Sequence, residues 1–259
     1  MNDSLEQIEV PHPSLRAIAV AIILGFVLAA LMILMPLGFF PKMQLLLSEA
    51  MIVVPSCIYL FMKKYNFRDV FRLRRVDKKL VIASVLLALA VVAIADEVDR
   101  LIGMFIEMPP EFEQVLLKIL KADTFTDWVM LILAAVILAG IVEEMLFRGM
   151  LLQSLERRLE LPYAIFLTAL VFAMFHPTPW LLQVLLFGLL LGYLAWRSKS
   201  IVPGIILHCM TNAFSIISLN TDFAWFKWYD WYDHVYPPVL VVAACVAYYS
   251  MKWFHHLTE

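Results

Sequence analysis

The sequence predicts an all-α membrane protein that crosses the bilayer about eight times. Hydrophobic residues make up 63% of the 259 residues and charged residues only 16%, against roughly 45–50% and 25% in soluble domains. The apolar residues are also gathered into stretches of about 20, the length that a helix needs to cross a hydrocarbon core of about 30 Å. We expect a single membrane domain over residues 1–259 that contacts the lipid bilayer.

The predicted spans follow one another along the chain with short polar or aromatic links. The first apolar stretch comes after a polar segment, residues 1–14, and has no small-residue cleavage site at its end. We therefore interpret it as a retained helix and not as a signal peptide. The predicted spans are residues 15–35, 44–62, 80–95, 128–150, 162–177, 180–196, 201–219 and 238–254.

Charged residues between the spans predict the orientation of the chain. The link 63–79 contains many Lys and Arg and only Asp69 and Asp77 as acids, whereas the link 96–127 is mainly acidic. Because positively charged links stay in the cytoplasm, the first link is expected inside and the second outside. The N-terminus is then cytoplasmic. The compact size and short links indicate a prokaryotic plasma membrane.

The composition disfavours two kinds of function. The formal net charge is -2 and the basic residues are confined to links, so a basic face for nucleic acid is not expected. Cys57, Cys209 and Cys245 lie inside apolar stretches and form no C-x-x-C pair, so neither disulfides nor a structural zinc site is expected.

Three of the predicted spans carry ionisable or amide side chains inside otherwise apolar runs. An ionisable side chain at mid-bilayer costs roughly 2.5–3.5 kcal/mol on insertion scales, so such residues mark functional sites by default. They are Glu143, Glu144 and Arg148 in the fourth span, His176 at the end of the fifth, and His208 and Asn212 in the seventh. We expect the active site between the fourth, fifth and seventh helices.

Helical spacing assigns different roles to the two glutamates. Glu144 and Arg148 are four residues apart, so they share a helix face and are expected to form a buried ion pair with a structural role. Glu143 points about 100° away from Glu144 and has no cation on its own helix. It must find a partner on another helix or take up a proton. His208 and Asn212 are also four residues apart and present two hydrogen-bond donors on one face.

The fourth and fifth spans are joined by a short turn near Arg158, so we expect an antiparallel hairpin. Glu143 and His176 are equally far from that turn, and should lie at similar depth, roughly 20–25 Å along their helices. His208 and Asn212 can reach a common pocket that opens toward the cytoplasm. A glutamate with a histidine can hold and deprotonate water, and two donors can stabilise the oxyanion of a tetrahedral intermediate. The residues therefore predict a hydrolase site.

These residues resemble the CAAX prenyl protease and bacteriocin-processing family, also called Abi, of glutamate-type intramembrane proteases. Its motifs are E-E-x-x-x-R, F-x-x-x-H and H-x-x-x-N on separate helices. The sequence matches them at Glu143, Glu144, Arg148, Phe172, His176, His208 and Asn212. The resemblance covers about residues 128–219, the expected catalytic core, and implies an eight-helix fold and cleavage of peptide bonds at the membrane.

The resemblance also implies the role of each residue. Glu143 and His176 would activate water, and His208 and Asn212 would form the oxyanion site. Phe172 is expected to pack and to position the helix that carries His176. The expected partners are the bilayer and a membrane-anchored peptide or protein substrate, and not nucleic acid.

Other interpretations of the same residues stay open. Family members are often labelled metalloproteases, so zinc held by Glu143, His176 and His208 is an alternative to the site without metal or other cofactor that we expect. A non-catalytic membrane scaffold or bacteriocin-immunity protein would share every sequence feature. A proton-coupled transporter would also keep carboxylates and histidines in the membrane.

Overall fold

The computed structural model describes residues 11–35, 41–221 and 228–259, which are helical almost throughout. Two short strands, β1 (Asp230–Trp231) and β2 (His234–Val235), form an antiparallel hairpin. The helices are α1 (Leu15–Leu34), α2 (Pro41–Met62), α3 (Phe67–Val70), α4 (Lys78–Gly103), α5 (Pro110–Leu120), α6 (Phe125–Leu131), η1 (Ile132–Leu138), α7 (Ala139–Glu143), η2 (Glu144–Leu151), α8 (Leu152–Glu156), α9 (Leu161–Met174), η3 (Thr178–Trp180), α10 (Leu181–Ser198), α11 (Val202–Asn220) and α12 (Pro237–Leu257). The predicted all-α class is confirmed.

Seven helical segments within the described residues are long and apolar enough to cross a membrane. The chain is therefore an integral, multi-pass membrane protein. These segments coincide with all the predicted spans except the fifth, residues 162–177. That span corresponds to α9, which ends at Met174 after 14 residues. At 1.5 Å per residue α9 is about 21 Å long, shorter than the hydrocarbon core.

The end of α9 has a local cause. Pro177 follows His176, and a proline disfavours helical geometry in the residue before it. The chain turns through η3 and returns in α10, which packs against α9. His176 consequently lies in the turn of a short helical hairpin and not on a helix that crosses the membrane by itself.

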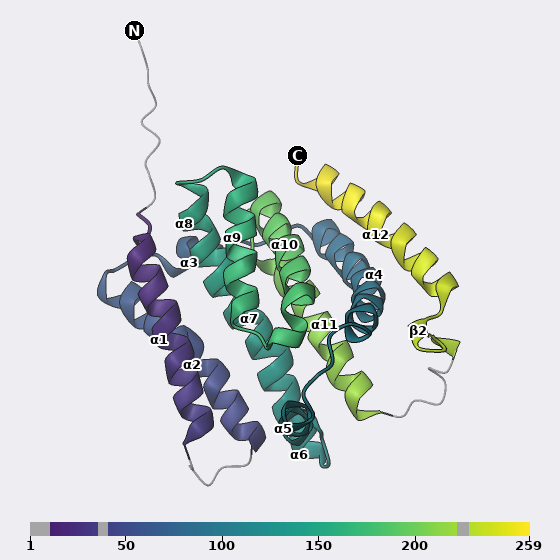
Figure 1. Ribbon diagram of the computed structural model, residues 1–259. Coiled ribbons are helices and arrows are strands. Elements are labelled where there is room, and N and C mark those ends of the chain that lie inside the picture. Colours follow the sequence, from purple (N-terminus) through teal and green to yellow (C-terminus); the bar gives the residue numbers. More distant parts are fainter. Residues whose placement is uncertain (1–10, 36–40, 222–227) are drawn as a thin grey trace.

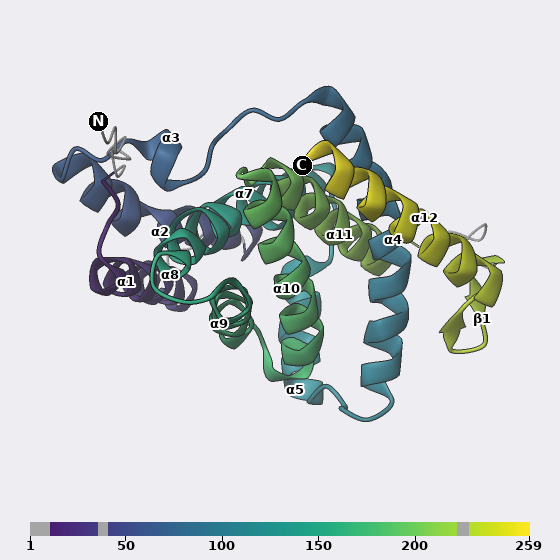
Figure 2. The ribbon, with the colours of Figure 1, turned by 90° about the horizontal axis from the view of Figure 1, so that it is seen from above.

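The segment Phe125–Glu156 is the central element of the molecule (Figure 1). Half of its apolar residue stretch (50%) is buried inside the protein, the largest share among the seven candidate spans. Helix α2 and helix α11 both pack against η1 and α7. Seen from above, α1 and α2 lie at one side and α4 and α12 at the other, with α9, α10 and α11 between them (Figure 2). Polar residues on the central segment are thereby shielded from lipid.

The central segment is not a regular α-helix. Two π-helical stretches, η1 and η2, flank the short helix α7. The second stretch begins at Glu144, directly after the α-helical Glu143. Short π-helical stretches inside α-helices are frequent at functional sites. The two neighbouring glutamates therefore lie where the backbone hydrogen bonding of the helix changes.

A set of polar contacts fastens the β-hairpin to α4. Arg100 Nη2 donates to Asp230 at 2.7 Å. Glu97 accepts a hydrogen bond from the Val235 backbone N–H at 2.8 Å, and its other oxygen lies 2.8 Å from His234 Nδ1. The hairpin lies at the end of α12 opposite to its C-terminus (Figure 1).

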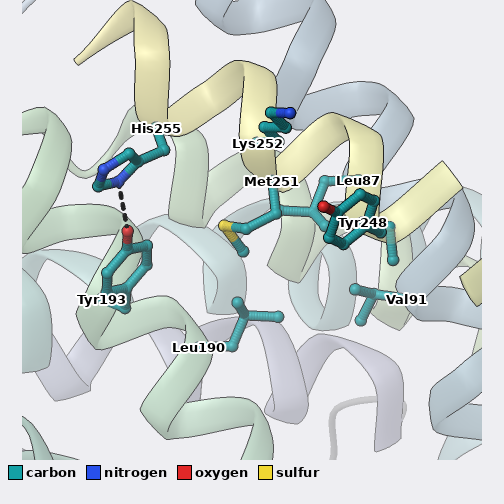
Figure 3. Close-up of a pocket in the computed structure, with 9 residues that line it drawn as sticks. Leu87, Val91, Leu190, Tyr193, Tyr248, Met251, Lys252 and His255 are labelled. Atoms are coloured by element: carbon teal, nitrogen blue, oxygen red, sulfur yellow. Dashed lines mark hydrogen bonds between the residues drawn. The ribbon is translucent and has the colours of Figure 1, made fainter. Parts of the chain in front are cut away.

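An apolar groove of about 500 Å³ lies between α4, α10 and α12 (Figure 3). At one end of it, Tyr193 and His255 are joined by a hydrogen bond of 3.0 Å. Its lining residues are Leu87, Val91, Leu190, Tyr193, Ala247, Tyr248, Met251, Lys252 and His255. None of these is a predicted site residue. Phe187 packs against the same cluster as Leu190, and its ring lies edge to face with that of His208.

Candidate active site

A fully buried ion pair lies on the central segment. Arg148 Nη1 donates to Glu144 Oε1 at 2.7 Å, and both side chains have 0% exposure. Arg148 Nη2 also donates to the Gly188 carbonyl of α10 at 3.4 Å, and its guanidinium lies 4.1 Å from the centre of the Phe172 ring of α9. The expected i,i+4 pair is present, and it joins η2 to both α9 and α10.

His208 lies between the two glutamates. Its Nδ1 is 3.4 Å from Glu144 Oε1, and its Nε2 is 3.6 Å from Glu143 Oε2. Glu143 is 8% exposed and His208 is 4% exposed. The partner that Glu143 was expected to need on another helix is therefore His208 of α11, a residue that the sequence assigns to the oxyanion site.

The ring of Phe172 contacts both histidines. Its centre lies 4.7 Å from that of His176 and 6.0 Å from that of His208, with the rings edge to face. His176 Nδ1 lies 2.9 Å from the Phe172 carbonyl oxygen. Because a carbonyl can only accept, this nitrogen carries the proton and Nε2 of the neutral ring is an acceptor. Phe172, the predicted packing residue, thus contacts both histidines.

Asn212 lies one turn beyond His208 on α11. Its Nδ2 donates to the Ala135 carbonyl of η1 at 2.8 Å. The amide has a second N–H, which can donate to another acceptor. The bond to Ala135 fixes the orientation of the side chain and holds α11 against the central segment.

Two glycines allow α11 and the central segment to approach closely. A Cβ at Gly204 of α11 would collide with Glu144 Oε2. A Cβ at Gly140 of α7 would lie 2.6 Å from Cys209 Sγ, closer than such atoms approach one another. Small residues are the usual means by which membrane helices pack backbone to backbone. The short distances between His208 and the glutamates depend on these missing side chains.

The alternative zinc site requires Glu143, His176 and His208 to surround one ion. Among the residues that the structure describes, no three His, Cys, Asp or Glu side chains are arranged so that they could hold a metal ion. Zinc requires such a group, usually with bonds of about 2.0–2.2 Å to nitrogen and oxygen. The three residues do not fit this arrangement, and the expectation of a site without a cofactor stays a prediction.

One candidate residue was missed in the sequence. Glu49 lies in α2, and its Oε2 is buried without a hydrogen-bond partner among the described residues, as is Oε2 of Glu143. Helix α2 packs against α7, the short helix that ends at Glu143. The rule that an ionisable side chain inside an apolar span is a functional candidate applies equally to Glu49. It was missed because it belongs to none of the three motifs.

Comparison with known families agrees with the motifs. Residues 125–214 match the family model described as type II CAAX prenyl endopeptidase Rce1-like. This stretch runs from α6 into α11 and includes every site residue predicted from the sequence. No curated protein and no solved structure matches the chain.

The match confirms the resemblance to the CAAX protease family and supports a CAAX-type intramembrane protease. It assigns no role to any single residue, so the catalytic roles given above stay predictions. The limits 128–219 of the catalytic core, the cytoplasmic N-terminus and the prokaryotic membrane stay predictions as well.

Proposed function

We propose that this chain is an intramembrane endopeptidase that hydrolyses a peptide bond in a membrane-associated polypeptide. The observation that carries the proposal is the position of Glu143. It is 8% exposed within a candidate span, and its Oε2 lies 3.6 Å from His208 Nε2 with no hydrogen bond to a described residue. A shielded carboxylate with an unused oxygen beside a histidine is suited to bind and deprotonate water.

Glu143 acts as the general base in this reaction. It takes one proton from a water molecule as the water oxygen bonds to the substrate carbonyl carbon. The proton then passes to the amide nitrogen as the C–N bond breaks. His176 helps to hold the water through Nε2, which is an acceptor while Nδ1 donates to the Phe172 carbonyl.

His208 and Asn212 stabilise the oxyanion that forms when water attacks. The distance of 3.6 Å between His208 Nε2 and Glu143 Oε2 exceeds an ordinary hydrogen bond, so an N–H at this nitrogen can donate to the substrate oxygen. Nδ1 of the same ring lies 3.4 Å from Glu144 Oε1, and a ring that donates both to Glu144 and to the oxyanion does so as the imidazolium. Asn212 contributes the amide N–H that does not bind Ala135. Loss of one such donor costs about 10²–10³ in kcat in other hydrolases.

Glu144 and Arg148 hold the site together and take no part in proton transfer. Their ion pair is fully buried and links three helices through Gly188 and Phe172. In this mechanism the water is activated by the carboxylate without a resident metal ion. The metal content of purified active protein tests that statement directly.

The proposed substrate is a polypeptide held at the membrane. The buried position of Glu143 on a membrane span favours a peptide bond that is presented at or within the bilayer. The name of the matching family refers to CAAX prenyl endopeptidases, so a lipid-modified C-terminal tail is the first substrate to test. We propose the broader class because the match covers residues 125–214 and not the whole chain.

The test uses purified protein in liposomes and two peptides of one sequence, one carrying a lipid chain near its C-terminus and one without it. We expect cleavage of the anchored peptide, with a lower kcat/KM for the free one, and a loss of at least about 10² in Glu143→Gln. Glu113→Gln, on the exposed surface of α5, is the matched control and should cleave normally. Undiminished cleavage by Glu143→Gln would contradict the proposal, and lack of any cleavage by the wild type would favour the scaffold alternative.

A further inference from the structure

The groove between α4, α10 and α12 is suited to an apolar chain. All three helices are candidate membrane spans, and Tyr248 in the groove wall is 62% exposed, so the groove opens on a lipid-facing surface. Most of the wall is apolar, with Leu87, Val91, Leu190 and Met251 among its side chains. Its volume of about 500 Å³ falls within the roughly 300–1,000 Å³ of sites that hold small organic molecules. A hydrocarbon chain can therefore lie in it.

One end of the groove is polar. Lys252 and His255 lie at this end, whereas Leu190 lies toward the other (Figure 3). The hydrogen bond between Tyr193 and His255 joins α10 to α12 there. Arg197, one turn after Tyr193 on α10, donates through Nη2 to the His255 carbonyl at 3.3 Å. Arg197 and Lys252 are therefore held at the same end of the groove.

The two cations at this end are not neutralised by the protein. Within the described residues, neither Arg197 nor Lys252 forms an ion pair with an acid. By contrast, Arg72, Arg100 and Arg148 each bind a carboxylate. A guanidinium has five N–H donors and an ammonium has three, and the bond to the α12 carbonyl uses only one of them. The groove therefore ends at donors that an external anion can use.

Other basic residues surround the same end. Helix α4 begins beside the end of α12, because residues of both helices belong to one buried cluster. The exposed Lys78 and Lys79 begin α4, and the exposed Lys199 follows α10. Two acids lie nearby: Asp77 caps α4 through the Lys79 N–H, and Glu259 faces two histidines of α12. Positive charge therefore predominates at this end of the groove.

We propose that the groove binds an anionic phospholipid, with an acyl chain along its apolar wall and the phosphate at Arg197 and Lys252. Basic pockets between membrane helices bind the head groups of anionic lipids, which gather in the cytoplasmic leaflet. The orientation predicted from the sequence puts this end of the molecule on that side. The lipid chain of a substrate would fill the same wall but brings no phosphate for the two cations, so the charges favour the phospholipid.

This inference goes beyond the proposed function, and binding tests it without any cleavage. The full chain is purified in a neutral detergent, and lipid binding is followed by native mass spectrometry. The probes are phosphatidylglycerol and phosphatidylcholine with the same acyl chains. We expect the wild type to bind phosphatidylglycerol at least about fivefold more tightly, the contribution of one basic residue beside an anionic lipid. Equal affinities for the two lipids would overturn the inference.

A pair of substitutions tests the two cations. Arg197→Gln with Lys252→Gln should weaken phosphatidylglycerol binding by about 25-fold, about fivefold for each charge, and leave phosphatidylcholine binding almost unchanged. The matched control is Lys63→Gln with Arg68→Gln, which removes the same charges from exposed positions outside the groove and should bind both lipids normally. Undiminished phosphatidylglycerol binding in the first pair, or an equal loss in the control, would overturn the inference.

A further substitution tests the apolar wall. Ala247 lines the groove on α12, so the ring added in Ala247→Phe should fill it and weaken binding of both lipids by at least about tenfold. The melting temperature without lipid shows whether the variant is folded. Unchanged affinity in a folded variant would place the acyl chain elsewhere and overturn the inference. If the variant is unstable, the two charge substitutions decide the question.

Two competitors identify the occupant. Glycerol 1-phosphate carries the head-group phosphate without acyl chains, and a lipid-anchored peptide carries a chain without the phosphate. We expect neither to displace phosphatidylglycerol at equal concentration. Displacement by glycerol 1-phosphate would mean that the site recognises an anion alone, and displacement by the peptide would mean that the substrate's chain occupies the groove. Either result would overturn the inference, while the proposed function would stand.

Discussion

Two ion pairs of equal length show how burial changes the meaning of the same contact. The Arg148–Glu144 pair and the Arg100–Asp230 pair both have nitrogen–oxygen distances of 2.7 Å. The first has 0% exposure on both sides, whereas the second has 27% and 47%. Each pair also has a histidine nearby that faces a glutamate, His208 on Glu144 and His234 on Glu97.

The difference follows from what each residue would do without its partner. A buried charge that loses its partner cannot be hydrated, so its burial strongly destabilises the folded protein. An exposed charge that loses its partner is solvated by water, so little is lost. The buried pair can therefore fix the geometry of a reaction site. The exposed pair fastens a surface hairpin and tolerates change.

The largest effect is expected from Arg148→Met. It leaves Glu144 buried without its cation and should destabilise the protein by about 3–5 kcal/mol. Unfolding in detergent, followed by circular dichroism, measures it. The double variant Glu144→Leu with Arg148→Met removes both charges and should recover most of the loss. If the single variant were as stable as the wild type, the central role of this pair would be wrong.

Gly204→Ala should have the next largest effect. The added Cβ meets Glu144 Oε2, and a shift of that carboxylate would disturb its buried ion pair with Arg148. Overpacking of this kind costs about 1–3 kcal/mol, and the displaced Glu144 should also lower kcat through His208. The control is Gly103→Ala at the end of α4, where a Cβ meets nothing within 4 Å. Equal melting temperatures of the two variants would refute the tight contact.

A smaller effect is expected from His12, which precedes α1. Burial, assisted by Arg157 and Arg72, lowers the pKa of His12 from 6.5 to about 4, although its bond to the Pro13 carbonyl opposes the shift. Because the pKa of His12 is lower in the folded protein, the unfolded protein binds more protons below pH 6.5. The free energy of unfolding is therefore unaffected by His12 above pH 6.5 and decreases as the pH falls toward about 4.

The ring is partly exposed, so we expect a loss of no more than about 1 kcal/mol. Melting temperatures of the wild type and of His12→Gln, measured between about pH 7 and about pH 4.5, should diverge in favour of the variant at the acidic end. Parallel curves would show that His12 remains hydrated in the folded protein.

The smallest effect is expected for the exposed pair. A double-mutant cycle with Arg100→Ala and Asp230→Ala should give a coupling energy of about 0.2–1 kcal/mol, which salt should reduce. Asp96 also binds Arg100, at 3.1 Å, so the cycle is repeated with Asp96→Ala to separate the two carboxylates. A coupling as large as that of the buried pair would break the comparison between the two regions.

Local sequence patterns sufficed for the fold class and for the pairing of Glu144 with Arg148. Apolar stretches of membrane length predicted the spans, and the spacing of Glu144 and Arg148 predicted a pair that the structure contains. Both features depend on neighbours within one helix, which periodicity describes well. The match over residues 125–214 agrees with the motifs that were identified in the same region.

Features that depend on contacts between helices were not predictable in this way. Helical periodicity gives the face on which His208 lies, but not the rotation of α11 that turns it toward both glutamates. The π-helical stretches on either side of α7 also change the faces on which residues of the central segment lie. Glu49 stands alone on its helix, so only packing against α7 connects it to Glu143.

The most direct test of the account compares Glu143→Gln with Glu144→Gln, two adjacent substitutions of the same kind. For each variant, cleavage of a membrane-anchored peptide and the melting temperature in detergent are measured on one preparation. We expect Glu143→Gln to lose at least about 10² in kcat with an unchanged melting temperature, and Glu144→Gln to lose stability first. Full cleavage by Glu143→Gln, with a clean loss of activity in a stable Glu144→Gln, would show that the roles of the two glutamates are reversed.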